Sequence, residues 1–181
     1  MKPNEKESID VKLFWNVQFI YELVLATMEL DIFEIKYKID NSLRSFNVQE
    51  IPDIDSFRNK TAYFEEINRE KTLYRKITSR NITRSINQYL THWFYPYKGK
   101  FHPQMIRSLL NFMNLKEGDT VLDPFIGSGT TALEAQLLGI NSIGIDVSEV
   151  CYLISKVKTN SVDVLPEIEE LYSDLNDKLL S

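Results

Sequence analysis

The chain has 181 residues, enough for one domain or a small pair, and its hydrophobic content of 43% can form a core. Met1–Asp10 is charged and lacks an apolar h-region, and the longest apolar stretch, Val17–Leu30, contains Gln18 and Glu22; we therefore expect no secretory signal and no membrane span. A single cysteine, Cys151, excludes an internal disulfide and suits a reducing cytoplasm, and with two histidines it offers no metal-ligand cluster.

The net charge of −5 conceals an uneven distribution of charge along the chain. Residues 58–107 contain eleven lysines and arginines against three glutamates, a net charge of +8, and the remaining residues carry −13. A basic band of this kind can contact phosphates even within an acidic protein. The overall charge therefore does not exclude DNA as a partner.

The first third of the chain is expected to be mainly helical. Apolar and aromatic residues in Val11–Asp40 predict a helix through about Leu30, followed by a strand or a helical turn over Ile32–Ile39. Asn47–Asp55 contains a proline and several acids, which is typical of a linker. We therefore treat residues 1–56 as a helical or mixed N-terminal region.

Residues 57–92 are expected to form a basic amphipathic helix, either continuous or broken once. Apolar and aromatic side chains recur here mostly at intervals of three, four and seven residues. Four cations would lie on the other face: Arg75, Lys76, Arg80 and Arg84. We interpret them either as a solvated surface or as contacts to a DNA backbone. The aromatic cluster at residues 93–97 is typical of a core or an interface, with base stacking as the alternative.

The most informative segment of the sequence is Thr120–Asp146. It begins with a short apolar strand, which Asp123 and the following proline end. A turn with Gly127 and Gly129 follows, and because glycine tolerates positive φ and lacks a Cβ, a ligand can approach this backbone closely. The turn lacks the Gly-Lys-Ser/Thr ending of a P-loop and the third glycine of a dinucleotide-binding fingerprint. Nucleoside triphosphates and dinucleotides are therefore disfavoured as ligands.

A helix and a second strand follow the turn. Thr130 and Thr131 can begin the helix, whose free amides favour an electronegative ligand, and Gly139 is a natural terminator. Ser142–Ile145 predicts a buried strand that ends at Asp146. A carboxylate there suits hydrogen bonds to ribose hydroxyls, and the alternative is that it caps the next helix. This order of elements is typical of a parallel α/β sheet that binds an adenosine-containing cofactor.

The sequence Asp-Pro-Phe-Ile-Gly-Ser-Gly-Thr-Thr at residues 123–131 closely resembles the S-adenosylmethionine loop of the amino-group DNA methyltransferases, which modify N6 of adenine or N4 of cytosine. Lys98–Ile106, with its Phe-His-Pro, resembles the stretch with which that family covers the methionine end of the cofactor. The resemblance spans about residues 93–160. It implies an α/β fold: a partial Rossmann-like methyltransferase domain over residues 93–181, preceded by the mainly helical N-terminal region.

The resemblance also implies S-adenosylmethionine as the cofactor. The residues that it assigns to the cofactor are Lys100, His102, Asp123, Phe125, Gly127, Ser128, Gly129, Thr130 and Asp146. For His102, the alternative is that His102-Pro103 only begins a helix, with proline in its first turn.

The sequence lacks the family's catalytic motif. The amino-group methyltransferases use an Asp/Asn/Ser-Pro-Pro-aromatic tetrapeptide to accept the amino hydrogens of a flipped base and to stack on it. None of the six prolines here is next to another, and we assign no catalytic residue. After Asp146 the sequence predicts two helices, Val147–Lys158 and Pro166–Leu180, and no further apolar strand. An incomplete sheet predicts an exposed apolar edge.

The sequence thus predicts the cofactor-binding part of a site-specific DNA methyltransferase of restriction–modification type. We expect it to be inactive alone, with the catalytic loop in a second polypeptide or in the lost remainder of a truncated gene. Self-association through the exposed edge is the alternative to a partner. An RNA base methyltransferase fragment and a non-catalytic regulatory protein that binds nucleic acid remain alternative functions.

Overall fold

The computed structural model describes residues 8–79, 85–161, 163–164 and 166–167. The N-terminal part contains an antiparallel sheet of order β2-β3-β1-β4-β5. Its strands are β1 (Ile9–Leu13), β2 (Tyr37–Ile39), β3 (Ser45–Val48), β4 (Phe64–Ile67) and β5 (Glu70–Lys71). Its helices are α1 (Ile20–Ile32), α2 (Ile54–Lys60) and α3 (Leu73–Ser79).

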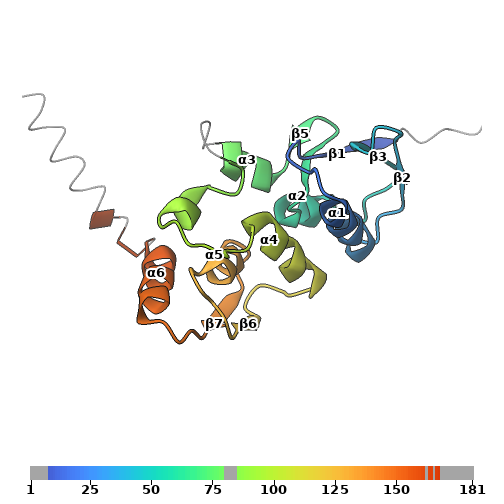
Figure 1. Ribbon diagram of the computed structural model, residues 1–181. Helices are drawn as coiled ribbons and strands as arrows, with labels where there is room; N and C mark the ends of the chain where they lie inside the picture. The colour runs from blue at the N-terminus through green and yellow to red at the C-terminus, as the bar shows by residue number, and fades with distance from the viewer. Residues whose placement is uncertain (1–7, 80–84, 162, 165, 168–181) are drawn as a thin grey trace, which may run out of the picture.

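The second part begins with a short 3₁₀ helix, η1, and contains a two-stranded parallel sheet. Its elements are η1 (Leu90–Trp93), α4 (Pro103–Phe112), β6 (Thr120–Asp123), α5 (Thr130–Leu137), β7 (Asn141–Gly144) and α6 (Glu149–Asn160). Figure 1 shows the two sheets on opposite sides of α4. None of the described helices is both long enough and apolar enough to cross a bilayer.

The α/β class is as expected, but the N-terminal region contains a sheet besides the expected helix α1. In β1 the side chains of Val11 and Leu13 are buried and Lys12 between them is exposed, which is the alternation of a strand. In β3, Phe46 and Val48 are buried in the same core, so the expected linker begins inside a strand. These strands are only a few residues long, and their period of two is hidden among neighbouring apolar residues.

The expectation of one basic helix over residues 57–92 is wrong. Helix α2 ends at Lys60, β4 and β5 follow, and α3 begins only at Leu73. The apolar stripe on which that expectation rested is nevertheless buried: Tyr63, Ile67, Tyr74, Ile86 and Tyr89 all lie in the N-terminal core. The chain leaves the helix at Thr61 because the carboxylate of Glu29 on α1 accepts hydrogen bonds from the backbone amides of Ala62 and Tyr63.

The strand–turn–helix–strand unit predicted for Thr120–Asp146 is confirmed, but its second strand, which was expected to be buried, is exposed along all of β7. Strands β6 and β7 are parallel, with Thr120 opposite Asn141 and Asp123 opposite Gly144, and α5 connects them. Apolar residues of α4 and α5 pack together on one face of this sheet, where Val121 joins them. The helix expected over Val147–Lys158 is α6, and that over Pro166–Leu180 falls almost entirely outside the described residues.

Helix α4 joins the two parts of the molecule through buried polar groups. Asn111 donates hydrogen bonds to Glu29 Oε1 at 3.0 Å and to the carbonyl oxygen of Lys60 at 2.9 Å. Arg107, which is fully buried, donates to the carbonyl oxygens of Asn59 and Lys60 at 2.9 and 3.0 Å. The last turn of α2 is therefore fixed to the helix that precedes the parallel sheet.

Candidate cofactor-binding site

The turn after β6 has the left-handed backbone that its glycines allow. Gly127 has φ +50° and Gly129, at the start of α5, has φ +79°. A Cβ on Gly129 would lie 2.9 Å from Oγ and 3.0 Å from Cα of Ser155 on α6. A Cβ on Gly127 would lie 3.3 Å from the ring of Tyr97. The glycines therefore permit both the backbone angles and the close approach of two other segments.

Asp123 shapes this turn with its carboxylate. Oδ1 accepts a hydrogen bond from the amide of Phe125 at 3.0 Å, and Oδ2 accepts one from the hydroxyl of Thr131 at 2.6 Å. The side chain thus ties the end of β6 to the first turn of α5. Of the two residues bound to Asp123, Phe125 is the more exposed, with 84% of its surface accessible.

Asp146 joins the end of β7 to the same turn. Its Oδ2 accepts from the amide of Gly127 at 2.9 Å, and its Oδ1 accepts from the amide of Ser148 at 2.8 Å. These hydrogen bonds, that of Ser148 foremost, lower the pKa of Asp146 below its usual value. The cap of α6 is Ser148, whose hydroxyl accepts from the amide of Cys151, and not Asp146. Asp146 therefore keeps an ionised carboxylate beside the glycine turn.

A cleft of about 350 Å³ lies between the glycine turn and residues 97–101. It is lined by Tyr97, Lys98, Gly99, Lys100, Phe101, Asp123, Phe125, Ile126, Gly127, Ser128, Thr130, Thr131 and Asp146. The residues assigned to the cofactor from the sequence thus come together, except Gly129 and His102. Gly129 is buried beneath the turn, and exposed His102 is the residue before Pro103 in the first turn of α4, as the helix-start interpretation predicts.

Two residues that line this cleft have a buried hydroxyl group without a partner in the described structure. Ser128 and Thr130 are 3% and 4% exposed, and neither Oγ of Ser128 nor Oγ1 of Thr130 makes a hydrogen bond. Buried polar groups are almost always satisfied, so unpaired hydroxyls at the start of α5 indicate a place for polar ligand atoms.

A buried polar cluster that the sequence did not reveal lies behind the turn. The carboxylate of Glu134 on α5 accepts hydrogen bonds from Tyr89 Oη and from His92 Nε2, the latter at 2.8 Å, and Arg107 Nη1 lies 3.5 Å away. Burial lowers the pKa of His92, although its hydrogen bond to Glu134 opposes this. The cluster fixes the 3₁₀ helix η1, which precedes the cleft-lining residues 97–101, against α5.

Two lysines donate to backbone carbonyl groups near the cleft. Lys100 Nζ lies 2.6 Å from the carbonyl oxygen of His92, and Lys158 Nζ lies 2.7 Å from that of Ser128. Burial lowers the pKa of Lys100, and burial together with the charge of Lys100 lowers that of Lys158 to about 8. No motif marks Lys158, although its spacing from the buried residues Cys151 and Ile154 places it on the core side of α6.

The expected DNA contacts are only partly described. Arg75 Nε lies 3.5 Å from Glu65 Oε2, so its charge is shared with a neighbouring carboxylate, whereas Lys76 is exposed. Arg80 and Arg84 lie outside the described residues. The described part of the chain contains no group of His, Cys, Asp and Glu that could hold a metal ion.

Comparison with known proteins decides the family. A sequence model of the N6/N4 methyltransferases, described as DNA methylase, matches residues 4–157. The chain belongs to the N6/N4 DNA methylase family. Methyltransferases of this family use S-adenosylmethionine in general as the methyl donor.

Several curated proteins are similar in sequence to parts of this chain. The type II methyltransferase M.BsoBI of Geobacillus stearothermophilus is 30% identical over 161 residues, which are 85% of this chain and 31% of that protein. M.MjaII of Methanocaldococcus jannaschii is 41% identical over 87 residues, 48% of this chain and 16% of that protein. A tRNA (guanine(10)-N2)-dimethyltransferase of M. jannaschii is 42% identical over 59 residues, 33% of this chain and 16% of that protein. The chain spans less than a third of the length of these relatives.

The cleft of this DNA methylase family member fits the methyl donor. Asp146 provides an ionised carboxylate at the end of β7, where it suits ribose hydroxyls. The unpaired hydroxyls of Ser128 and Thr130, at the amino end of α5, suit the carboxylate of an amino acid. Phe125 and Phe101 are more than half exposed and can cover apolar parts of the ligand.

Proposed function

We propose that this chain provides the S-adenosylmethionine-binding part of a site-specific DNA methyltransferase that modifies N6 of adenine or N4 of cytosine. The observation that carries the proposal is the cleft between residues 97–101 and the glycine turn, with two buried hydroxyls that lack partners. Membership of the DNA methylase family supports DNA as the substrate. The exposed Lys76 is a candidate contact to the DNA backbone.

The residues of the cleft would hold and orient the methyl donor. Asp146 would accept hydrogen bonds from ribose hydroxyls while its other bonds keep the glycine turn in place. Ser128, Thr130 and the free amides of α5 would bind the carboxylate end. The bound cofactor supplies an electrophilic methyl group on a sulfonium. Holding it in one orientation converts an encounter in solution into a positioned reaction, which is the part of catalysis that this chain can provide.

The acceptor side of the reaction would come from residues outside these 181. No Asp/Asn/Ser-Pro-Pro-aromatic tetrapeptide occurs in the sequence. Parallel sheets are usually covered on both faces, yet Leu122 and Ile143, which are opposite each other in β6 and β7, are 58% and 55% exposed. Because Val121 packs toward α4 and α5, these two side chains lie on the opposite face, which no helix of the described residues covers. We place the attachment of the missing segment on this face.

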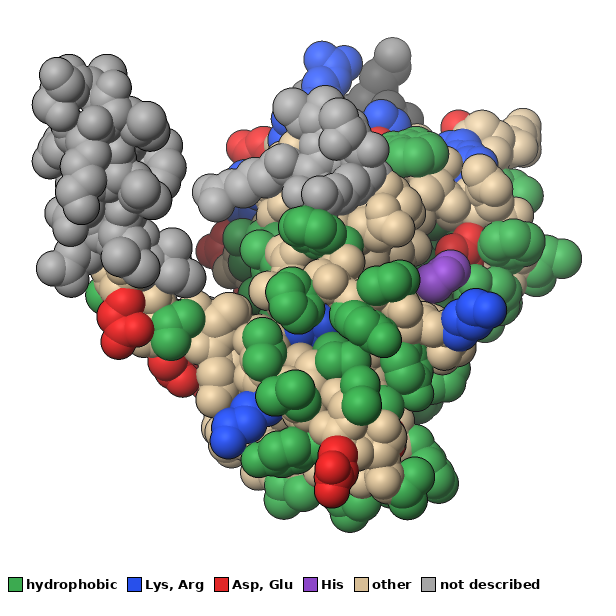
Figure 2. All heavy atoms as spheres, turned by 60° about the vertical axis from the view of Figure 1, so that its left-hand side comes forward, with side chains coloured by type: hydrophobic (Ala, Val, Ile, Leu, Met, Phe, Trp, Pro, Cys, Tyr) green, Lys and Arg blue, Asp and Glu red, His purple; other side chains and the backbone are tan. Residues whose placement is uncertain are grey.

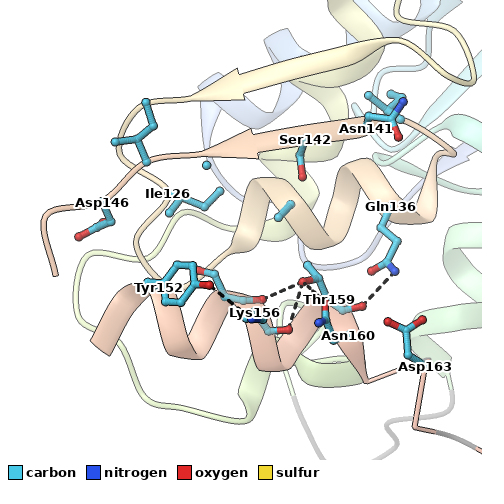
Figure 3. A pocket seen from close by; sticks show the side chains of 15 residues that line it. Ile126, Gln136, Asn141, Ser142, Asp146, Tyr152, Lys156, Thr159, Asn160 and Asp163 are labelled. Carbon is cyan, nitrogen blue, oxygen red and sulfur yellow. Dashed lines mark hydrogen bonds between the residues drawn. The ribbon is translucent and has the colours of Figure 1, made fainter. Parts of the chain in front are cut away.

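The outer edge of β7, which pairs with no strand among the described residues, offers further room for such a segment. A groove of about 570 Å³ separates β7 from α6, and Ser142 lies on one side of it with Tyr152 and Lys156 on the other (Figure 3). Hydrophobic side chains also cover much of the face that is seen when the α6 side of the molecule is brought forward (Figure 2). Val150, Tyr152 and Leu153 of α6 are each more than half exposed. An added strand beside β7 would cover part of this apolar surface.

Two assays on the purified chain test the proposal. Ultraviolet crosslinking of S-adenosylmethionine labelled in its methyl group measures binding, and retention of label on DNA measures transfer. We expect crosslinking that excess S-adenosylhomocysteine suppresses, and no transfer to DNA by the chain alone. Absence of crosslinking would reject the cofactor role, and transfer to DNA that Asp123→Ala abolishes would reject the need for a missing segment.

RNA is the second candidate substrate, because the chain is 42% identical to a tRNA dimethyltransferase, although over only 59 residues. The family match extends over residues 4–157 and includes the N-terminal sheet, which favours DNA. A parallel transfer assay with unmodified tRNA separates the two. Label on tRNA and none on DNA would favour the RNA alternative.

A further inference from the structure

Lys158 is a buried lysine directly behind the glycine turn. Lys158 is 1% exposed, and its Nζ donates a hydrogen bond to the carbonyl oxygen of Ser128 at 2.7 Å. Among the described residues no carboxylate forms an ion pair with it, and burial, followed by repulsion from the ammonium of Lys100, lowers its pKa. Burial of an ammonium without a counter-charge is costly. A group kept at such a cost needs an explanation beyond packing.

Ser155, one turn earlier on α6, holds the neighbouring carbonyl group. Its Oγ donates to the carbonyl oxygen of Gly127 at 2.9 Å, and its backbone lies so close to Gly129 that only glycine fits there. Helix α6 therefore binds two successive carbonyl oxygens of the turn, those of Gly127 and Ser128. Carbonyl oxygens held on this side do not point their negative ends at a ligand in the cleft, which Ser128 and Thr130 line.

We propose that Lys158 and Ser155 are positioning residues for the cofactor: they keep the carbonyl oxygens of the glycine turn on the α6 side, and Lys158 adds positive charge behind the turn. The charge would favour the carboxylate end of S-adenosylmethionine at the start of α5. This inference rests on the proposed function. Neither residue needs to touch the cofactor, since both act through the backbone of Gly127 and Ser128.

The charged groups around Lys158 determine how the effect depends on pH. Lys100 repels it, His92 carries no charge above a pKa that burial lowers, and Glu134 is engaged by Tyr89, His92 and Arg107. With a pKa of about 8, Lys158 is charged at neutral pH and loses its proton as the pH rises through 8. The attraction for a carboxylate is therefore present below pH 8 and is lost above it.

Hydrogen–deuterium exchange on the unliganded chain tests the contact with the turn. We expect the amides of Gly129 and Leu133, which donate to Ile126 and Gly129, to exchange at least tenfold faster in Lys158→Met. Lys156→Met is the matched control, because Lys156 is an exposed lysine of the same helix. It should leave these amides unchanged. Ser155→Ala is a smaller change that should also speed the exchange of these amides. It provides the test if Lys158→Met fails to fold.

Calorimetric binding of S-adenosylhomocysteine at pH 7 and pH 9.5 tests the role of the charge. We expect about tenfold weaker binding to Lys158→Met at pH 7, and a wild-type affinity that falls toward that of the variant at pH 9.5. Lys158→Gln keeps a donor for Ser128 but no charge, so it should bind with intermediate affinity. The amino group of the ligand titrates equally in all variants, so differences between them report Lys158.

The outcomes separate this inference from the proposed function. Unchanged exchange in both Lys158→Met and Ser155→Ala would overturn the positioning role. Identical affinities at both pH values in wild type and Lys158→Met would overturn the role of the charge. If wild type binds no S-adenosylhomocysteine while exchange rises in Lys158→Met, the proposed function fails but the α6 contacts with the turn stand.

Discussion

At the scale of single residues, the glycine turn is the part of the site that sequence could predict. Gly127 and Gly129 both have left-handed backbone, and Asp146 reaches the turn from β7. Such positions accept very few residue types, so the sequence carries a strong signal there. Lys158 and Glu134 leave a weaker trace, because a polar residue on the core side of a helix is recognised only once its partners are known.

Gly129 offers a direct test of the turn. In Gly129→Ala the new methyl group would meet Ser155 at 2.9–3.0 Å at a φ of +79°. Gly99→Ala is the control, since Gly99 has a φ of +83° but a Cβ added there would meet no atom within 4 Å. Strain at φ should cost both variants roughly 1 kcal/mol of unfolding free energy, and overpacking should cost Gly129→Ala about 1–3 kcal/mol more. Urea unfolding measures this, and equal losses would show that the close approach to α6 is absent.

At the scale of elements, α4 and α5 define the frame of the site and were largely predictable. His102-Pro103 marked the start of α4, and Thr130 and Gly139 marked the ends of α5, whereas the strands of two to five residues in the N-terminal sheet gave no clear period. The chain between α2 and β4 also depends on Glu29, which lies 33 residues before Ala62. A contact of that sequence separation has no local signature.

Glu29 therefore provides the test of the joint between the two parts. Its carboxylate accepts hydrogen bonds from Thr61, Ala62, Tyr63 and Asn111, so the amide group in Glu29→Gln would turn a donor toward other donors. We expect a loss of about 2 kcal/mol of unfolding free energy, measured by urea titration. Asp31→Asn, an exposed acid at the end of the same helix, should change it by less than about 0.5 kcal/mol. A similar small loss in Glu29→Gln would contradict the assigned role.

The burial of His92 in the 3₁₀ helix η1 predicts that the stability of the chain depends on pH. Burial lowers the pKa of His92 in the folded chain, so the unfolded chain, with a pKa of about 6.5, binds a proton more readily. The contribution of His92 to stability is therefore complete above about pH 6.5 and is lost as the pH falls below that value. Glutamine can donate to Glu134 without titrating, so His92→Gln should weaken this dependence between pH 7.5 and 5.5. Identical pH profiles for both chains in thermal unfolding would contradict the prediction.

At the scale of the whole molecule, the parallel sheet has two described strands and leaves apolar side chains exposed. Its two strands have an apolar face at Leu122 and Ile143 and a groove beside β7, and the chain spans 31% of M.BsoBI and 16% of M.MjaII. The exposed apolar surface was expected from the sequence, because no apolar strand follows Asp146. The sequence carries no signal for the partner or the recognised DNA site that the proposed function requires.

The most direct test of the central proposal is the affinity of the purified chain for S-adenosylmethionine, measured by isothermal titration calorimetry. We predict a dissociation constant in the micromolar range, and binding at least about tenfold weaker for Asp146→Asn, whose amide cannot accept both backbone hydrogen bonds as the carboxylate does. Glu149→Gln, an exposed acid in the first turn of α6, should bind as wild type does. No binding at millimolar cofactor, or equal binding by Asp146→Asn, would contradict the proposed site.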